Sequence, residues 1–94
     1  MQAETYFVYM LKCADGSLYT GIAKNLDKRL DTHRRGNGAR YVKARLPFEL
    51  VYFETASSRS GALKREFQIK KLTRSQKIAM LAAMHGASDL PGLI

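Results

Sequence analysis

Two tyrosines lie close together near the start of the chain, in the stretch VYMLKCADGSLYTG over residues 8–21. A phenol can serve as a packed aromatic ring, or it can donate or accept a proton where neighbouring cations lower its pKa. Tyr9 and Tyr19 could act together only if both side chains point to the same side of a common sheet. The geometry of the hairpin between them therefore decides whether this stretch is able to do chemistry.

The length of the hairpin loop determines whether the two tyrosine side chains lie on the same face of the sheet. A two-residue loop would place Tyr9 and Tyr19 on opposite faces. A three-residue loop that ends at Gly16 pairs Tyr9 with Gly21 and leaves the tyrosines as diagonal neighbours, about 7–8 Å apart on one face. The sequence favours this loop, because a type I turn followed by a left-handed glycine is common in hairpins. Gly21 agrees with it, since a glycine inside a strand marks a close approach by another group.

The next helix is expected to bring a guanidinium and an imidazole to the tyrosines. Arg29 and His33 are four residues apart, so they share one face of a helix over residues 26–35. Leu26 and Leu30 form the adjoining apolar stripe that would pack on the sheet. We therefore expect Arg29 and His33 at the edge of the face that carries the tyrosines.

Glu66 is a lone carboxylate in a basic stretch, ALKREFQIKKLT. Such a carboxylate is either the partner of an ion pair, for example with Lys70 at i+4, or a ligand for a cation. We expect Leu63 and Phe67 to pack this helix against the sheet, with Glu66 beside them.

The elements that must position these side chains follow from the hydrophobic pattern and the turn residues. Strands are expected over residues 5–13, 17–23 and 48–55. Helices are expected over residues 26–35, 60–72 and 73–86, with a basic loop, with or without one helical turn, over residues 36–47. Asn25 and a capping box at Thr73 open two of the helices, and Gly36 ends the first. We predict one α+β domain over residues 1–94, a small three-stranded antiparallel sheet flanked by helices in the order β-β-α-β-α-α.

The composition is that of a small basic globular domain. A formal charge of +8 attracts polyanions, of which nucleic acid is the commonest in the cytosol. No apolar run approaches the ~18 residues of a membrane span, and a chain without Trp is poorly suited to lie on a membrane surface. The N-terminus lacks the pattern of a signal peptide, and the single cysteine, Cys13, reads as a buried thiol. We expect a cytoplasmic protein with no membrane partner.

These residues resemble the signatures of the GIY-YIG nuclease family. The two signature tripeptides are Phe7-Val8-Tyr9 and Tyr19-Thr20-Gly21. The helix after them carries arginine and then histidine at the family's spacing, and the later helix carries the family's glutamate. The stretch YTGIAKNLDKRL is also similar to the N-terminal nuclease domain of the excision-repair endonuclease C subunit. The resemblance covers roughly residues 5–75 and is best to the small stand-alone bacterial members, the YhbQ-like group.

The resemblance implies hydrolysis of a phosphodiester bond with one divalent ion, Mg²⁺ or Mn²⁺. Glu66 would be the only protein ligand of the ion, and Arg29 would bind the scissile phosphate. Tyr9 and Tyr19 would line the site, and one of them, with Tyr19 favoured, would position or deprotonate the attacking water. His33 would assist proton transfer or bind phosphate. Without the family, the same side chains would be an ion pair, solvated charges and packed rings.

Eight basic residues are candidates for contact with the phosphate backbone. They are Lys24, Arg34, Arg35, Arg40, Lys43, Arg45, Lys70 and Lys71. Tyr41 and Phe48 could stack on an unpaired base, although core packing is the better interpretation for Phe48.

The resemblance thus implies a Mg²⁺-dependent endonuclease that acts on DNA rather than RNA. Branched or damaged structures in repair or recombination are the expected substrates, with a protein partner that could supply specificity. No asparagine follows Asn37, whereas several family members complete their site with one near the C-terminal end. A catalytically weak nucleic-acid-binding module of the same fold therefore stays open as an alternative, as does a protein associated with RNA or the ribosome.

Overall fold

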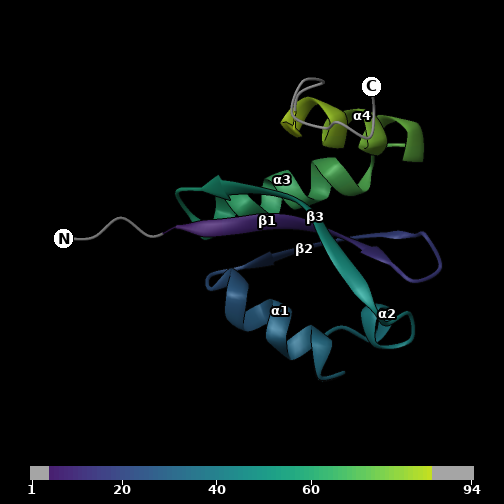
Figure 1. The fold of residues 1–94 in the computed structure, drawn as a ribbon. Helices are drawn as coiled ribbons and strands as arrows, with labels where there is room; N and C mark the ends of the chain where they lie inside the picture. The colour runs from purple at the N-terminus through teal and green to yellow at the C-terminus, as the bar shows by residue number, and fades with distance from the viewer. Residues whose placement is uncertain (1–4, 86–94) are drawn as a thin grey trace.

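The computed structural model describes residues 5–85, which form one antiparallel sheet between two layers of helix (Figure 1). The sheet has the strand order β2-β1-β3, with β1 (Tyr6–Cys13), β2 (Leu18–Ala23) and β3 (Phe48–Ala56). One face is covered by α1 (Leu26–Arg34) and the short α2 (Arg40–Lys43), and the other by α3 (Arg59–Lys70) and α4 (Arg74–His85). The predicted α+β fold and its element order are confirmed, with α2 as the helical turn inside the basic loop.

The central strand β1 is buried on both faces and divides the interior into two clusters. Val8 and Met10 point to the side of α3 and α4, where they pack with Tyr52, Ala62 and Ile69. Alternate side chains point to the side of α1 and α2, since successive residues of a strand face opposite ways. This second cluster consists of Tyr9, Leu11, Ala23, Leu30 and Val42. Cys13, at the end of β1, is a buried free thiol, as expected.

The hairpin between β1 and β2 has the three-residue loop that the sequence favoured. The Cys13 amide donates to the Ser17 carbonyl at 2.9 Å, and the Gly16 amide donates to the Cys13 carbonyl at the same distance. Gly16 has φ +83°, the left-handed conformation that the loop requires. The register therefore sets Tyr9 opposite Gly21.

The helix ends follow the predicted caps. The Asn25 side chain accepts from the Lys28 amide at 3.0 Å, and Gly36 has φ +77° just beyond the end of α1. At the start of α4, Thr73 and Gln76 form the predicted capping box, with hydrogen bonds of 2.9 and 3.2 Å. Gly86, the predicted end of this helix, lies outside the described residues. Across residues 5–85 no helix is long and apolar enough to cross a membrane.

The prediction for the packing face of α3 is wrong. Leu63 and Phe67 are exposed, and the helix packs through Ala62 and Ile69 instead. The small Ala62 side chain lets the helix approach the sheet closely, and a half-buried ion pair between Arg65 and Glu54 of β3, at 2.8 Å, fixes the same rotation. Glu66 is one helical turn from both Ala62 and Ile69, and its side chain is only 19% exposed.

The conformation of Gly16 leads to a test of the hairpin. A Cβ at this position would meet no atom within 4 Å, so a substitution there reports backbone strain alone. Gly16→Ala should lower the free energy of unfolding by about 1–2 kcal/mol in a urea titration. Gly16→Asn should lose less, because Asn tolerates the left-handed conformation. Equal stability of Gly16→Ala and the wild-type chain would contradict the assigned loop.

Candidate active site

Tyr9, Tyr19 and His33 form one aromatic cluster beneath β1 and β2. The Tyr9 hydroxyl lies 2.8 Å from His33 Nε2, and neither residue is more than 1% exposed. The Tyr19 ring lies 6.4 Å from the Tyr9 ring and 5.7 Å from the His33 ring, centroid to centroid. The two tyrosines therefore share a face, as the loop length predicted, and α1 brings His33 between them.

Two glycines leave the space that this cluster fills. A Cβ on Gly21 would lie 2.6 Å from the Tyr9 hydroxyl oxygen, and a Cβ on Gly38 would lie 2.9 Å from His33 Cγ. Real side chains do not approach so closely, so each glycine is required by the group packed on it. The sequence indicated that a group packs closely on Gly21. It gave no such indication for Gly38, which lies in the loop before α2.

Burial determines the protonation states of the hydrogen-bonded pair. Burial raises the pKa of Tyr9 to about 12, with smaller increases from Tyr19 and Glu66 that Arg29 partly offsets. The pKa of His33 is lowered, by burial first and by the positive charge of Arg29 second. At neutral pH a protonated phenol therefore meets a neutral imidazole, and the two share a single hydrogen bond. His33 Nδ1 is buried without a hydrogen-bond partner in the part of the chain that the structure describes.

Arg29 lies at the solvent edge of the cluster. Its side chain is exposed, and one guanidinium nitrogen, Nη1, donates to the Ile22 carbonyl at 3.3 Å. Arg29 lines two neighbouring hollows of about 360 Å³ each, and Lys24 lines both. Both groups were expected at the edge of the tyrosine face; Arg29 lies there, whereas His33 is buried inside the cluster.

Glu66 approaches from the opposite layer. Its side chain is 19% exposed and forms an ion pair with Lys70, with 3.3 Å between Oε2 and Nζ. The same carboxylate also raises the pKa of Tyr9, as the smallest of the causes that act on it. Glu66 is thus paired with Lys70 and also acts electrostatically on the phenol.

A single carboxylate fits only one type of metal site. No group of three His, Cys, Asp or Glu side chains that could hold an ion occurs within residues 5–85. Mg²⁺ keeps several waters and is commonly bound through one or two carboxylates plus substrate phosphate, and Mn²⁺ also favours oxygen ligands. Glu66 suits such an ion, whereas a zinc site with several protein ligands does not fit these residues.

The predicted phosphate-binding residues lie in both layers. Those on the side of α1 and α2 are Lys24, Arg34, Arg35, Arg40, Lys43 and Arg45, whereas Lys70 and Lys71 are at the end of α3. Several of these cations already have partners. Arg35 pairs with Asp31 at 2.8 Å, Lys70 pairs with Glu66, and Lys71 lies over the exposed Phe67 ring at 4.3 Å.

Tyr41 and Arg45 form a second aromatic contact next to the cluster. The Tyr41 ring stacks on Tyr19 with centroids 5.9 Å apart, and the Arg45 guanidinium lies 3.8 Å from the Tyr41 centroid. Arg45 also pairs with Asp15 in the hairpin turn at 3.0 Å. These contacts connect α2 to the hairpin and pack Tyr41 against one face of the Tyr19 ring. Phe48 packs edge-on against His33, as its core interpretation predicted.

Sequence reasoning missed Arg59. This residue begins α3 directly after its N-cap, Ser58, and lines the same hollow as Lys24 and Arg29. In the sequence nothing distinguishes Arg59 from the other basic residues of the chain. Only the packing of α3 beside β2 brings it to the rim of the site. The hollow is therefore lined by three cations from three different segments.

The close approach of Gly21 to Tyr9 leads to a second test. Gly21→Ala should force the Tyr9 hydroxyl away and lower the free energy of unfolding by about 1–3 kcal/mol. Gly61→Ala in α3 is the matched control, because its new methyl would lie 3.2 Å from Ser58 Oγ and 3.9 Å from Ala56 Cβ, with no contact as short as those at Gly21. That control should be neutral or mildly stabilising in the same urea titration. Two variants of equal stability would contradict the crowding at Gly21.

The lowered pKa of His33 predicts how stability depends on pH. Below the ordinary histidine pKa of about 6.5, His33 is protonated in the unfolded chain but still neutral in the folded chain. The free energy of unfolding therefore decreases as the pH is lowered. The decline should begin near pH 6.5, reach up to about 1.4 kcal/mol per pH unit, and stop below the folded-state pKa. Urea titrations between pH 7.5 and 5.5 should show this slope in the wild-type chain. A His33→Gln variant with the same slope would mean that another group is responsible.

The comparisons with known proteins show the family of the chain. Residues 5–79 match the model of the GIY-YIG catalytic domain. A UPF0213 protein of Staphylococcus epidermidis is 54% identical over 78 residues, which is 83% of this chain and 95% of that protein. A UPF0213 protein of Staphylococcus aureus is 50% identical over the same shares of both chains.

Two solution NMR structures are similar to the fold. One is a UPF0213 protein from Bacillus halodurans, with a TM-score of 0.60, 35% identity and coverage of 90% of both chains. The other is a protein from E. faecalis, with a TM-score of 0.62, 36% identity and coverage of 90% of this chain and 92% of that one. The sequence match, the element order and the clustered tyrosines agree, and the chain belongs to the GIY-YIG catalytic domain family, among its small bacterial UPF0213 proteins.

Proposed function

We propose that this chain is an endonuclease that hydrolyses phosphodiester bonds in DNA with the help of one divalent ion, Mg²⁺ or Mn²⁺. One observation carries the proposal: the buried Tyr9–His33 pair has Tyr19 packed on it and the charges of Arg29 and Glu66 within range. The side chains come from the hairpin, α1 and α3. Such convergence of titratable groups with perturbed pKa values is typical of a reaction site.

The cations at the rim would bind the substrate backbone. The Arg29 guanidinium would hold the scissile phosphate in a fork geometry and stabilise the charge that develops on it. Lys24 and Arg59 line the same hollow and would neutralise neighbouring phosphates. This arrangement would contact the backbone rather than base edges, so recognition of DNA shape is the expected mode for so small a domain.

Glu66 would hold the ion together with a phosphate oxygen of the substrate. The ion would supply Lewis-acid stabilisation and a bound water of lowered pKa. To bind it, the Glu66 carboxylate would exchange its ion pair with Lys70 for the metal. Lys70 is the exposed partner of this pair, and ion pairs with one partner in solvent contribute about 0–1 kcal/mol, so the exchange costs little.

The two phenols would have different functions. Tyr9 is fully buried and has a pKa of about 12, so it keeps its proton and holds the His33 imidazole in place. Tyr19 is only half-buried and lies against both of those rings. Tyr19 is therefore the phenol that would position or deprotonate the attacking water, as the sequence favoured.

A nucleic-acid-binding module without strong catalysis is the second candidate. The Lys70 ion pair neutralises the one carboxylate that would hold the metal, which is the specific observation in its favour. This candidate predicts salt-dependent DNA binding without cleavage. Branched DNA, a function in repair, a cytoplasmic location and a protein partner that supplies specificity extend the main proposal and rest on the family resemblance.

Nicking of supercoiled plasmid and cleavage of branched DNA test the proposal. The wild-type chain should cut in the presence of Mg²⁺ or Mn²⁺ and not in EDTA. Tyr19→Phe should slow cleavage by about 10²- to 10⁴-fold, the usual contribution of a general base. Glu66→Gln and Arg29→Ala should reduce cleavage at least as strongly.

Lys64→Gln is the matched control, because Lys64 is exposed on the same helix and lines none of the hollows described above. It should cut at close to the wild-type rate. Wild-type DNA binding without more cleavage than Glu66→Gln would reject the enzyme and favour the binding module.

A further inference from the structure

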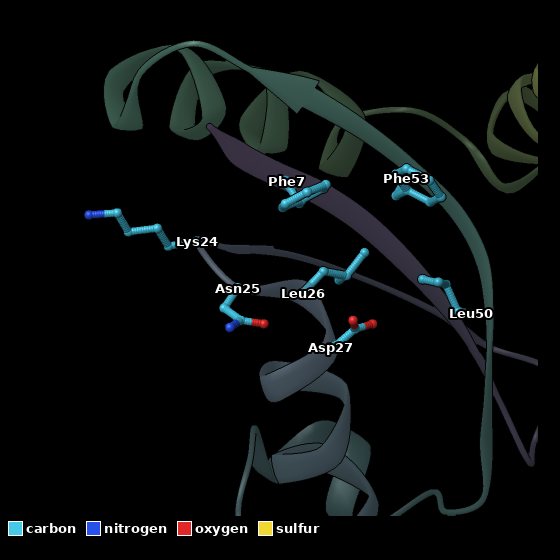
Figure 2. A pocket seen from close by; sticks show the side chains of 7 residues that line it. All are labelled: Phe7, Lys24, Asn25, Leu26, Asp27, Leu50 and Phe53. Carbon is cyan, nitrogen blue, oxygen red and sulfur yellow. The ribbon is translucent and has the colours of Figure 1, made fainter. Parts of the chain in front are cut away.

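A separate hollow lies beside the cation-lined rim, where α1 begins under the edge of the sheet (Figure 2). It has a volume of about 440 Å³, within the range of small-molecule sites. Its apolar lining comes from both a helix and two strands, namely from Phe7, Leu26, Leu50 and Phe53. Lys24, Asn25 and Asp27 form its polar margin, and in Figure 2 the Lys24 side chain extends away from the two aromatic rings. The proposed hydrolysis uses none of the four apolar side chains.

Two aromatic rings give this hollow its character. Phe7 and Phe53, on adjacent strands, lie edge to face with centroids 6.1 Å apart. Phe53 is 41% exposed, although it sits in the middle of β3 and faces the same side of the sheet as the buried Tyr9. Helix α1 covers Tyr9 but leaves Phe53 open, so a flat aromatic surface is available to a ligand.

Lys24 connects this hollow to the candidate active site. The same residue lines the aromatic hollow and both hollows that Arg29 lines. A strand whose phosphates lie along Lys24 and Arg29 would therefore carry its next nucleotide to the aromatic rings. A base in a duplex is paired and stacked on both sides, so only an unpaired base could enter.

We propose that the hollow at Phe7 and Phe53 binds an unpaired base of the DNA next to the scissile phosphate. The inference rests on the proposed function and adds a substrate class to it: DNA with a single-stranded segment beside the cut. Stacking on an aromatic ring is tolerant of sequence, because every base has a π-face. The chain would thus select for DNA structure without reading sequence.

Phe53 variants test the proposal through binding in EDTA, where no cutting can occur. The probes are a fluorescein-labelled oligothymidylate and a duplex of the same length at one fixed salt concentration, read by fluorescence anisotropy. Phe53→Ala should weaken binding of the single strand by about ten-fold and leave duplex binding unchanged. Phe53→Tyr should keep the wild-type affinity, because it retains the ring.

Ile78→Ala is the control, an exposed apolar residue on α4 in the other layer that should change neither affinity. If Phe53→Ala does not fold, Phe53→Leu replaces it in the test. Phe53→Leu should also bind the single strand more weakly than the wild-type chain, because leucine keeps the apolar volume but has no ring. Unchanged single-strand affinity, or equal losses for both probes, would overturn the proposal. Self-association that depends on Phe53, seen by sedimentation, would assign the hollow to a second copy instead.

The plasmid and branched-DNA cleavage assay described above, run beside these binding measurements, separates the two claims. A Phe53-dependent preference for the single strand without cleavage of plasmid or branched DNA would reject the nuclease and keep the base-binding hollow. Cleavage by the wild-type chain without that preference would keep the nuclease and reject the hollow.

Discussion

The buried hydrogen bond between Tyr9 and His33 joins β1 to α1 at the centre of the molecule, 2.8 Å from oxygen to nitrogen. Both groups are removed from water, so each would leave the other unsatisfied at a cost of about 1–3 kcal/mol if it moved away. Gly21 must lack a side chain so that the Tyr9 hydroxyl fits, and Gly38 must lack one beside His33. The rotation of α1 that brings His33 inward also sets Arg29 at the rim.

The electrostatics of the site follow from this single burial. Removal from water disfavours the charged form of both partners, which raises the pKa of Tyr9 and lowers that of His33. A neutral, hydrogen-bonded centre is thereby surrounded by cations, at Arg29, Lys24 and Arg59, that are suited to bind phosphate. The separation of a neutral interior from a basic rim lets the same side of the molecule attract a polyanion without destabilising its own core.

Local chemistry in the sequence was enough to predict the elements and much of the cluster. The Gly16 loop, the Asn25 cap and the capping box at Thr73 each depend on neighbouring residues only, and all three are confirmed. The shared face of the tyrosines followed from the loop length. The chain also belongs to the family that its tripeptides indicated.

Long-range packing was beyond the reach of the same reasoning. Ala62 and Ile69, rather than Leu63 and Phe67, pack α3 on the sheet, because contact with β3 sets the rotation of the helix. Arg59 and Gly38 belong to the site only through contacts with distant segments. Hydrophobic pattern cannot distinguish two stripes on one helix when both carry apolar residues.

One measurement tests most directly whether residues from both layers form a single ion-binding site: paramagnetic relaxation by Mn²⁺ in the NMR spectrum of the chain with thymidine monophosphate present. The account predicts that resonances near Glu66 on α3 and near Gly21 on β2 broaden together, and that Glu66→Gln abolishes both effects. Broadening that survives in Glu66→Gln, or that centres on other carboxylates such as Asp15 or Asp31, would contradict it.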